Sequence, residues 1–78
     1  MYIHDNHGNT PLHHAASRCH LEVVRLLLER NAEVDVQNDG GATPLLPASA
    51  AGHDDVVMLL LDHNADIHVR DDEGWTAL

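Results

Sequence analysis

The stretch Gly8-Asn9-Thr10-Pro11-Leu12 returns 33 residues later as Gly41-Ala42-Thr43-Pro44-Leu45, and a third time as Gly74-Trp75-Thr76-Ala77-Leu78. Aligning residues 10–42 with residues 43–75 gives identity at 15 of 33 positions without a gap. A fixed period of this length is typical of stacked arrays, in which each unit contacts only its neighbours. The period therefore predicts the architecture and directs the question of function toward surface recognition.

Each unit is expected to begin with a short helix. Thr10 can cap the helix, and Pro11 is tolerated at its first position because the N–H of that position has no helical partner. Ala15 and Ala16 form a small face that lets another helix approach closely. This first helix is expected to end near residues 18–19.

A second helix is expected over residues 21–30, where Leu21, Val24, Leu27 and Leu28 share one apolar stripe. Asn31 is suited to end this helix in a left-handed conformation. Residues 33–41 then predict an extended arm and a turn before the next Thr-Pro pair. Because an isolated pair of such helices cannot bury its apolar stripe, the units must stack.

These residues closely resemble the ankyrin repeat family. Thr10-Pro11-Leu12-His13 followed by Ala15-Ala16 matches the family's first helix, and residues 23–28 match its second helix. Residues 32–35 match the end of its repeat, with Asn31 in place of a glycine. The resemblance implies an all-α solenoid of stacked helix-turn-helix units with projecting, hairpin-like loops. It makes residues 1–78 a single array, composed of a partial lead-in at 1–4, a repeat at 5–37, a repeat at 38–70 and a truncated repeat at 71–78.

The second repeat departs from the first at two adjacent positions. The family's histidine bonds the capping threonine and a neighbouring loop, and His13 is expected to do so, whereas Leu46 cannot. Pro47 lies four residues after Thr43, lacks the N–H of the first helical hydrogen bond, and biases Leu46 away from helical angles. The sequence therefore predicts a distorted or delayed first helix in the second repeat.

Cys19 occupies the position that Gly52 holds in the second repeat. A positive φ at Cys19 would cost about 1 kcal/mol, so that Cys19→Gly is expected to raise the melting temperature. As the single cysteine of the chain it cannot form an internal disulfide, which fits a reducing compartment. We expect an intracellular protein, cytoplasmic or nuclear.

The acidic composition limits the kinds of partner. Four Lys and Arg residues against 13 Asp and Glu residues give a net charge of −9 with histidine neutral. Such a surface repels nucleic acid and anionic lipid, and favours a protein partner with a basic surface. No apolar run approaches the ~20 residues that span a membrane.

Neither a metal site nor a catalytic site is expected. His4 with His7, or His13 with His14, could supply two ligands, but a closed zinc site needs four. The carboxylates of Asp54 and Asp55 fall in the first turn of a helix, where negative charge is favourable. The run at residues 71–73 falls in a solvated loop. We therefore expect no enzyme activity and no cofactor.

The resemblance implies that partners are bound through loop tips and the exposed side of the first helices. On this chain those positions are Asn6, His7, Asn9, Ser17, Arg18, Asp39, Gly40, Ala42, Ala50, Ala51, Asp72, Glu73 and Trp75. Trp75 is the most suggestive of them, because an exposed aromatic side chain often dominates binding energy. The alternative is that Trp75 covers the exposed end of the core.

Some members of the family are hydroxylated at the residue that Asp35 and His68 occupy here. The alternative is that both are ordinary loop residues. For the chain as a whole we expect an interaction module that is a fragment of a larger ankyrin-repeat protein. The alternatives are a structural spacer or an engineered scaffold without a partner of its own. Two repeats are fewer than the usual three needed for stability, so self-association through exposed repeat ends is a further hypothesis.

Overall fold

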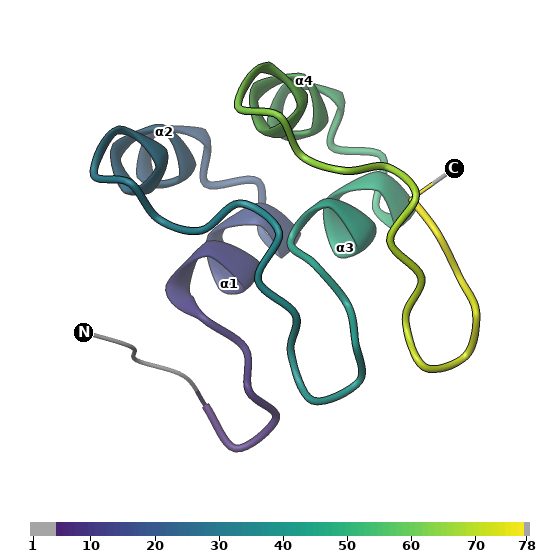
Figure 1. Ribbon diagram of the computed structural model, residues 1–78. Coiled ribbons are helices and arrows are strands. Elements are labelled where there is room, and N and C mark those ends of the chain that lie inside the picture. Colours follow the sequence, from purple (N-terminus) through teal and green to yellow (C-terminus); the bar gives the residue numbers. More distant parts are fainter. Residues whose placement is uncertain (1–4, 78) are drawn as a thin grey trace.

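Four α-helices and their connecting loops make up residues 5–77, the part of the chain that the computed structural model describes, and no strand occurs among them (Figure 1). The helices are α1 (Pro11–Ser17), α2 (Leu21–Glu29), α3 (Leu45–Ala50) and α4 (Asp54–Asp62). The expected lead-in at residues 1–4 and the last residue of the third motif, Leu78, lie outside the described residues.

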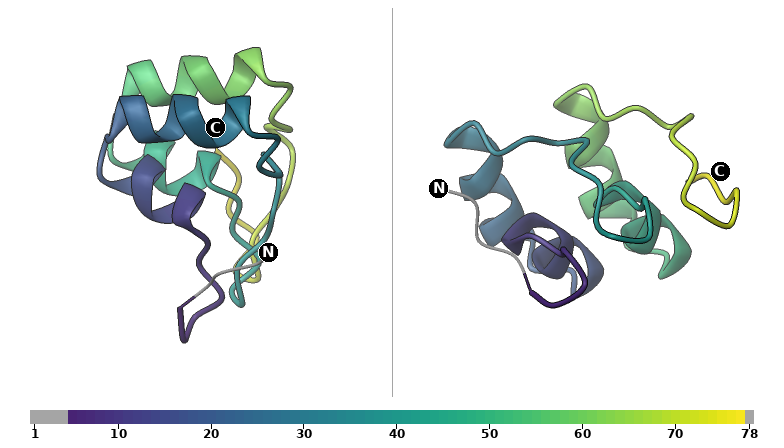
Figure 2. Two further views of the ribbon diagram at one scale, coloured as in Figure 1. Left: turned by 90° about the vertical axis from the view of Figure 1, so that its left-hand side faces the viewer. Right: turned by 60° about the horizontal axis from the view of Figure 1, so that its bottom comes forward.

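The helices form two layers, with α1 beside α3 in one layer and α2 beside α4 in the other (Figures 1 and 2). Contacts join α1 to α2 and α3 to α4 within a unit, and α1 to α3 and α2 to α4 between units. The loops that follow α2 and α4 project to one side of both layers (Figure 2). The prediction of an all-α solenoid of stacked helix-turn-helix units is confirmed.

The core lies between the two layers and is built from small and branched aliphatic side chains. Its fully buried members are Leu12, Ala15, Ala16, Val24, Leu28, Leu45, Ala48, Val56 and Leu60. Among the described residues, no helix is long and apolar enough to cross a membrane.

The first unit starts its helix as the sequence predicts. The Thr10 Oγ1 atom accepts the His13 N–H at 3.4 Å, and the His13 Nδ1 atom accepts the Thr10 N–H at 3.1 Å. Pro11 is the first residue of α1. These two reciprocal bonds satisfy two backbone donors that a helix end leaves unpaired.

The second unit starts its helix differently. α3 begins at Leu45, one residue later in the repeat than α1, and it has no side-chain cap. In place of the missing Pro47 N–H, the Leu46 N–H donates to the Thr43 carbonyl at 3.2 Å. The predicted delay is therefore confirmed, at one residue.

Beyond this start the helix continues through Ala50, and the expectation that Leu46 avoids helical angles is wrong. Both Leu46 and Pro47 lie within α3, and the Ala51 N–H donates to the Pro47 carbonyl at 3.0 Å. The delayed start makes Pro47 the third residue of the helix, where a backbone N–H has no helical partner to lose. Pro47 is thus spared most of the cost of an interior proline.

The second helices end in left-handed residues. Asn31 after α2 has a φ of 66° and Asn64 after α4 has a φ of 69°. In each case the next N–H reaches back to the helix, from Ala32 to the Leu27 carbonyl and from Ala65 to the Leu60 carbonyl. The prediction that Asn31 ends the helix in this way is confirmed.

The projecting loops share one hydrogen-bonding scheme. The side-chain Oδ1 of Asn38 accepts the N–H groups of Gly40 and Ala42, and that of Asp71 accepts those of Glu73 and Trp75. Neighbouring loops are joined through the backbone, from the Asp39 N–H to the His7 carbonyl at 2.9 Å and from the Asp72 N–H to the Gly40 carbonyl at 2.8 Å. The loops therefore form a connected, hairpin-like row.

Candidate functional site

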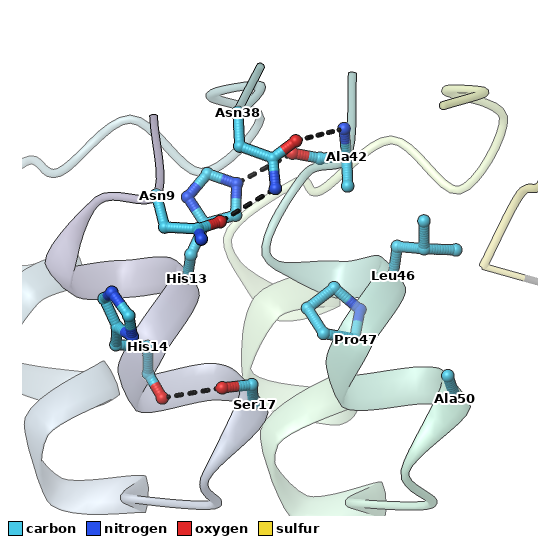
Figure 3. A pocket seen from close by; sticks show the side chains of 9 residues that line it. All are labelled: Asn9, His13, His14, Ser17, Asn38, Ala42, Leu46, Pro47 and Ala50. Carbon is cyan, nitrogen blue, oxygen red and sulfur yellow. Dashed lines mark hydrogen bonds between the residues drawn. The ribbon is translucent and has the colours of Figure 1, made fainter. Parts of the chain in front are cut away.

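Two adjoining hollows open on the face that α1, α3 and the loops form together. The first, which we call the α1–α3 hollow, has a volume of about 400 Å³ (Figure 3). It is lined by Asn9, His13, His14, Ser17, Asn38, Ala42, Leu46, Pro47 and Ala50. The second, the α3–loop hollow, has a volume of about 430 Å³ and is lined by Leu46, Ser49, Ala50, Asp71, Trp75, Thr76 and Ala77. Leu46 and Ala50 belong to both hollows.

The polar side chains that line the α1–α3 hollow form hydrogen bonds that join the two repeats. The His13 Nε2 atom lies 2.7 Å from the Ala42 carbonyl oxygen, and Asn38 Nδ2 donates to Asn9 Oδ1 at 2.8 Å (Figure 3). Since a carbonyl only accepts and the Thr10 N–H only donates, the His13 ring must be neutral, with its proton on Nε2. The expected histidine tie is confirmed, and these groups are engaged before any partner arrives.

Burial lowers the pKa of His13 below its ordinary value of 6.5, while the bond to the Ala42 carbonyl acts in the opposite direction. A charged imidazole would lose its hydration in this buried position, and a proton on Nδ1 would displace the Thr10 N–H. His13 is therefore built to stay neutral and structural rather than to exchange protons with a substrate.

Asp5 anchors the first loop. Its Oδ1 atom accepts the N–H groups of Asn9 and His7, and its Oδ2 atom lies 3.0 Å from His14 Nε2. These bonds, that of the Asn9 backbone first, hold the pKa of the Asp5 carboxyl well below its usual range. The charged form is thus favoured by folding, and its contribution to stability is lost only as the pH falls through this low pKa.

The α3–loop hollow is more apolar than its neighbour. Leu46 takes the place of His13, and Trp75 is 65% exposed at its edge. The loop is tied to α3 by the hydroxyl of Ser49, which donates to the Ala77 carbonyl. Trp75 is not among the partly buried side chains that pack against the core.

The proposed binding positions divide into exposed and half-buried groups. Exposed are Asn6, His7, Arg18, Asp39, Gly40, Ala50, Ala51, Asp72, Glu73 and Trp75. Half-buried are Asn9, Ser17 and Ala42. The Asn9 side chain is hydrogen-bonded to Asp5 and to Asn38, so it mainly stabilises the loops.

Among the lining residues that sequence reasoning did not select as binding positions are His14, Leu46, Pro47 and Ser49. The signal that could have found them is the comparison of the two copies, because Leu46 and Pro47 put apolar side chains where the first repeat has histidines. Such replacements on a solvated face change what that face can bind.

His20 and His53 hold equivalent positions at the start of α2 and α4, yet neither side chain caps its helix. The His53 Nε2 atom instead lies 3.1 Å from the Ser17 carbonyl of the first unit. The Ser17 carbonyl only accepts, so His53 donates and ties the two units together.

Metal-ligating side chains do not cluster in the part of the chain that the structure describes. No group of three or more His, Cys, Asp or Glu side chains among residues 5–77 could hold a metal ion. Cys19 is exposed, with a φ of 59°.

The proposed hydroxylation positions lie in the segments that follow α2 and α4. Asp35 is half-buried, and its Oδ1 atom accepts the Asp66 N–H at 2.9 Å. His68 is exposed, and its N–H donates to Asp66 Oδ1 at 2.8 Å.

The two-layer stack and its bonded loops agree with comparison to known families. A model of the ankyrin repeat matches residues 7–39, and a model described as ankyrin repeats (many copies) matches residues 29–78, more than half of the chain. The chain therefore belongs to the ankyrin repeat family. Repeats of this family are generally protein–protein interaction modules rather than enzymes.

Two curated proteins are similar to short parts of the chain. The rice (Oryza sativa subsp. japonica) protein named "Probable E3 ubiquitin-protein ligase XBOS33" is 57% identical over 30 residues. The ankyrin repeat protein FPV233 of fowlpox virus (strain NVSL) is 49% identical over 35 residues. These matches cover 38% and 44% of this chain but only 6% and 7% of the relatives.

Proposed function

We propose that this array is part of a larger ankyrin-repeat protein and binds a partner protein through its loop tips and the exposed side of α1 and α3. The observation that carries the proposal is that some polar groups on this face are bonded within the scaffold while other side chains are exposed. The polar side chains of His13 and Asn38 in the α1–α3 hollow are hydrogen-bonded to other repeat residues. Asp39, Asp72 and Trp75, in contrast, are exposed on the loops beside the two hollows.

The charge of the chain favours a basic surface on the partner. The net charge is −9 with histidine neutral, and three exposed carboxylates, those of Asp39, Asp72 and Glu73, lie on the loops. Complementary charge speeds encounter and selects against acidic competitors. We place the protein inside the cell, cytoplasmic or nuclear, on the ground of its single cysteine.

An alanine series tests this function. Arg18, Asp72 and Trp75 are changed one at a time in the full-length protein, and its partners are captured from the native cell and quantified. Glu22 on α2 is exposed away from the hollows and serves as the control. We expect Trp75→Ala and Asp72→Ala to weaken capture of at least one partner, with Glu22→Ala unchanged.

Equal capture by every variant would contradict the proposed surface and favour a structural spacer or an engineered scaffold. Asn9 is left out of the series, because its loss would disturb the loop through Asp5 and Asn38. Self-association through the exposed repeat ends is tested by sedimentation of the purified chain, where a strictly monomeric profile at all concentrations would exclude it.

Hydroxylation of Asp35 and His68 stays a secondary proposal. His68 is the more accessible of the two, because the Asp35 carboxylate is half-buried and bonded to the next repeat. Mass spectrometry of protein from its native cell would show an added oxygen on the peptide that contains His68. Peptides free of this mass would rule the modification out under those conditions.

A further inference from the structure

We propose that the α3–loop hollow receives one large apolar side chain from a partner segment that carries Lys or Arg beside that side chain. This inference rests on the proposed function and adds the chemistry of the partner to it.

The apolar floor of the hollow follows from the loss of the histidine in the second repeat. In the first repeat His13 is 3% exposed and donates to the Ala42 carbonyl. Trp75 is the equivalent of Ala42, and the side chain of Leu46 has no donor with which to reach the Trp75 carbonyl. The Trp75 carbonyl accepts only the loop bond that both repeats share, from the Asp71 N–H at 2.9 Å, as the Ala42 carbonyl accepts the Asn38 N–H at 2.9 Å. The helix and the loop are therefore not tied at this point, and Leu46 is left half-buried at the edge of an open hollow.

The aromatic wall of the hollow is held in place before a partner binds. Asp71 Oδ1 accepts the Trp75 N–H at 2.8 Å, and the Asp72 N–H donates to the Gly40 carbonyl at 2.8 Å. Ser49 fixes the end of the same loop through the Ala77 carbonyl. A side chain carried on a loop bonded at these points loses little freedom on binding, which favours affinity. Trp75, 65% exposed beside Leu46 and Ala50, is thus suited to pack against an apolar side chain.

The loop at the edge of the hollow, which we call its rim, is acidic, and Asp71 of this loop lines the hollow. Asp72 and Glu73 are exposed and directly precede the Gly74-Trp75 pair, and Asp39 lies on the neighbouring loop that the Asp72 backbone contacts through Gly40. Neither hollow has Lys or Arg among its described lining residues. Arg70 precedes the loop but does not belong to either lining. No ion pair among the described residues engages Asp72 or Glu73, so that Lys or Arg on the partner could pair with their carboxylates.

Charge also decides against a second copy of the chain as the occupant. Each copy carries a net charge of −9, so that a second copy would bring further carboxylates to an acidic rim. Like charges brought together across an interface oppose association. A basic segment from another protein is the occupant that fits.

An unbiased selection tests the proposal. Random twelve-residue peptides displayed on phage are selected on the folded chain. We expect the enriched peptides to carry an aromatic or large aliphatic residue within two positions of Lys or Arg. One enriched peptide is then synthesised with a fluorescent label for measurement of affinity by anisotropy.

The variants of the chain give the expected pattern. Trp75→Ala should weaken binding by at least about tenfold. Asp72→Asn and Glu73→Gln should each weaken it by about two- to fivefold at low salt, less at high salt. Met58→Ala removes an apolar side chain that is 61% exposed on α4, outside both hollows, and should leave the affinity unchanged. Trp75 is the single tryptophan of the chain, so that its emission should shift when the peptide binds to the wild-type protein.

Four results would overturn the proposal. Enriched peptides without basic residues would contradict the acidic rim. Peptide binding that withstands Trp75→Ala would place the peptide outside the α3–loop hollow. If Arg18→Ala or Asp39→Ala abolished that binding, the proposed function would stand and only the proposal for this hollow would be wrong. No enrichment of peptides, together with unchanged capture across the alanine series, would contradict both proposals. A Trp75 emission that changes with protein concentration alone would identify a second copy as the occupant.

Discussion

His13 and Leu46 hold the same position of the repeat, 33 residues apart, and only the histidine joins a helix to the next loop. The difference lies in the donors that each side chain offers. Imidazole accepts the Thr10 N–H at one nitrogen and donates to the Ala42 carbonyl from the other, whereas leucine can do neither. One substitution thus turns a structural contact into open, apolar surface.

The neutrality of His13 predicts a pH dependence of stability. Because its folded pKa lies below 6.5, its contribution is fully present above pH 6.5 and is lost as the pH falls toward the lower folded pKa. We expect His13→Leu to lower the free energy of unfolding by about 1–3 kcal/mol at pH 7.5. The gap between wild type and variant should narrow at pH 5 in urea unfolding. A gap that widens on acidification would contradict the neutral tautomer.

Cys19 predicts a gain in stability on substitution by glycine. Its φ of 59° lies in the left-handed region, where the equivalent Gly52 has a φ of 76°. Relief of backbone strain worth about 1–2 kcal/mol, less the added entropy of glycine in the unfolded chain, leaves about 0.5–1 kcal/mol. We expect Cys19→Gly to raise the melting temperature by several degrees in calorimetry.

Gly52→Ala is the matched control for Cys19→Gly. A Cβ at Gly52 would meet no atom within 4 Å, so that any loss of stability reports on the backbone alone. A decrease for Gly52→Ala with no increase for Cys19→Gly would show that Cys19 makes compensating contacts.

At the scale of the element, α1 and α3 differ by one residue at the start. The His14 N–H donates to the Thr10 carbonyl at 3.2 Å, and Pro47, in the equivalent position, cannot donate. α3 then begins at Leu45 and keeps the remainder of its bonds, because a proline within the first turn costs a helix little. The chain absorbs the proline by shortening a helix rather than by breaking it.

The reciprocal change in the first repeat tests this account. His14→Pro should delay α1 by one residue and disturb its capping box. Its free energy of unfolding should therefore be about 1–2 kcal/mol lower than that of His14→Ala. His14→Ala removes only the exposed contact with Asp5 and should leave the stability nearly unchanged. Unfolding in urea distinguishes the two variants. Equal stability would mean that the backbone bond at this position contributes nothing.

At the scale of the whole molecule, equivalent residues differ in burial according to which neighbour they face. Val23 is 44% exposed while Val56 is fully buried, and Leu28 is 5% exposed while Leu61 is 38% exposed. Val23 and Val56 are equivalent positions on the side of the helix that faces the preceding unit. Leu28 and Leu61 are equivalent positions on the side that faces the following unit. Stacking of one unit on another thus buries a stripe from each.

This arrangement predicts unequal effects of identical substitutions. Val56→Ala should cost about 2 kcal/mol, and Val23→Ala less than about 0.5 kcal/mol. Leu28→Ala should likewise cost about 2–5 kcal/mol, clearly more than Leu61→Ala. Chemical denaturation of the four variants measures these differences. Similar losses within each pair would show that a second copy or another chain covers the exposed stripes in solution.

Much of the fold could be predicted from the sequence, because its determinants are local. The Thr10-Pro11 start, the apolar stripe of the second helix and the left-handed end at Asn31 depend on residues within one turn of each other. The effect of Pro47 on its helix could be predicted less well. A proline's cost depends on its position in the helix, and that position was set by where the helix begins.

The candidate site was predicted only in part. The 33-residue period located the loops and first helices, and so Asp72, Glu73 and Trp75 were expected at the surface. The hollow beside Leu46 was not foreseen, because it forms where a helix meets a loop about 30 residues further along the chain. The bonds that engage Asn9 and Asn38 join adjacent repeats in the same way.

The sequence by itself determined the family, the unit and the order of its helices, since each depends on short-range patterning that repeats at a fixed spacing. Only the tertiary structure decided which polar groups are consumed by the scaffold and which stay available to a partner. The physical reason is that these bonds form between units. The Ala42 carbonyl accepts the Asn38 N–H within its own loop, but it gains His13 as a second donor only once two repeats are stacked.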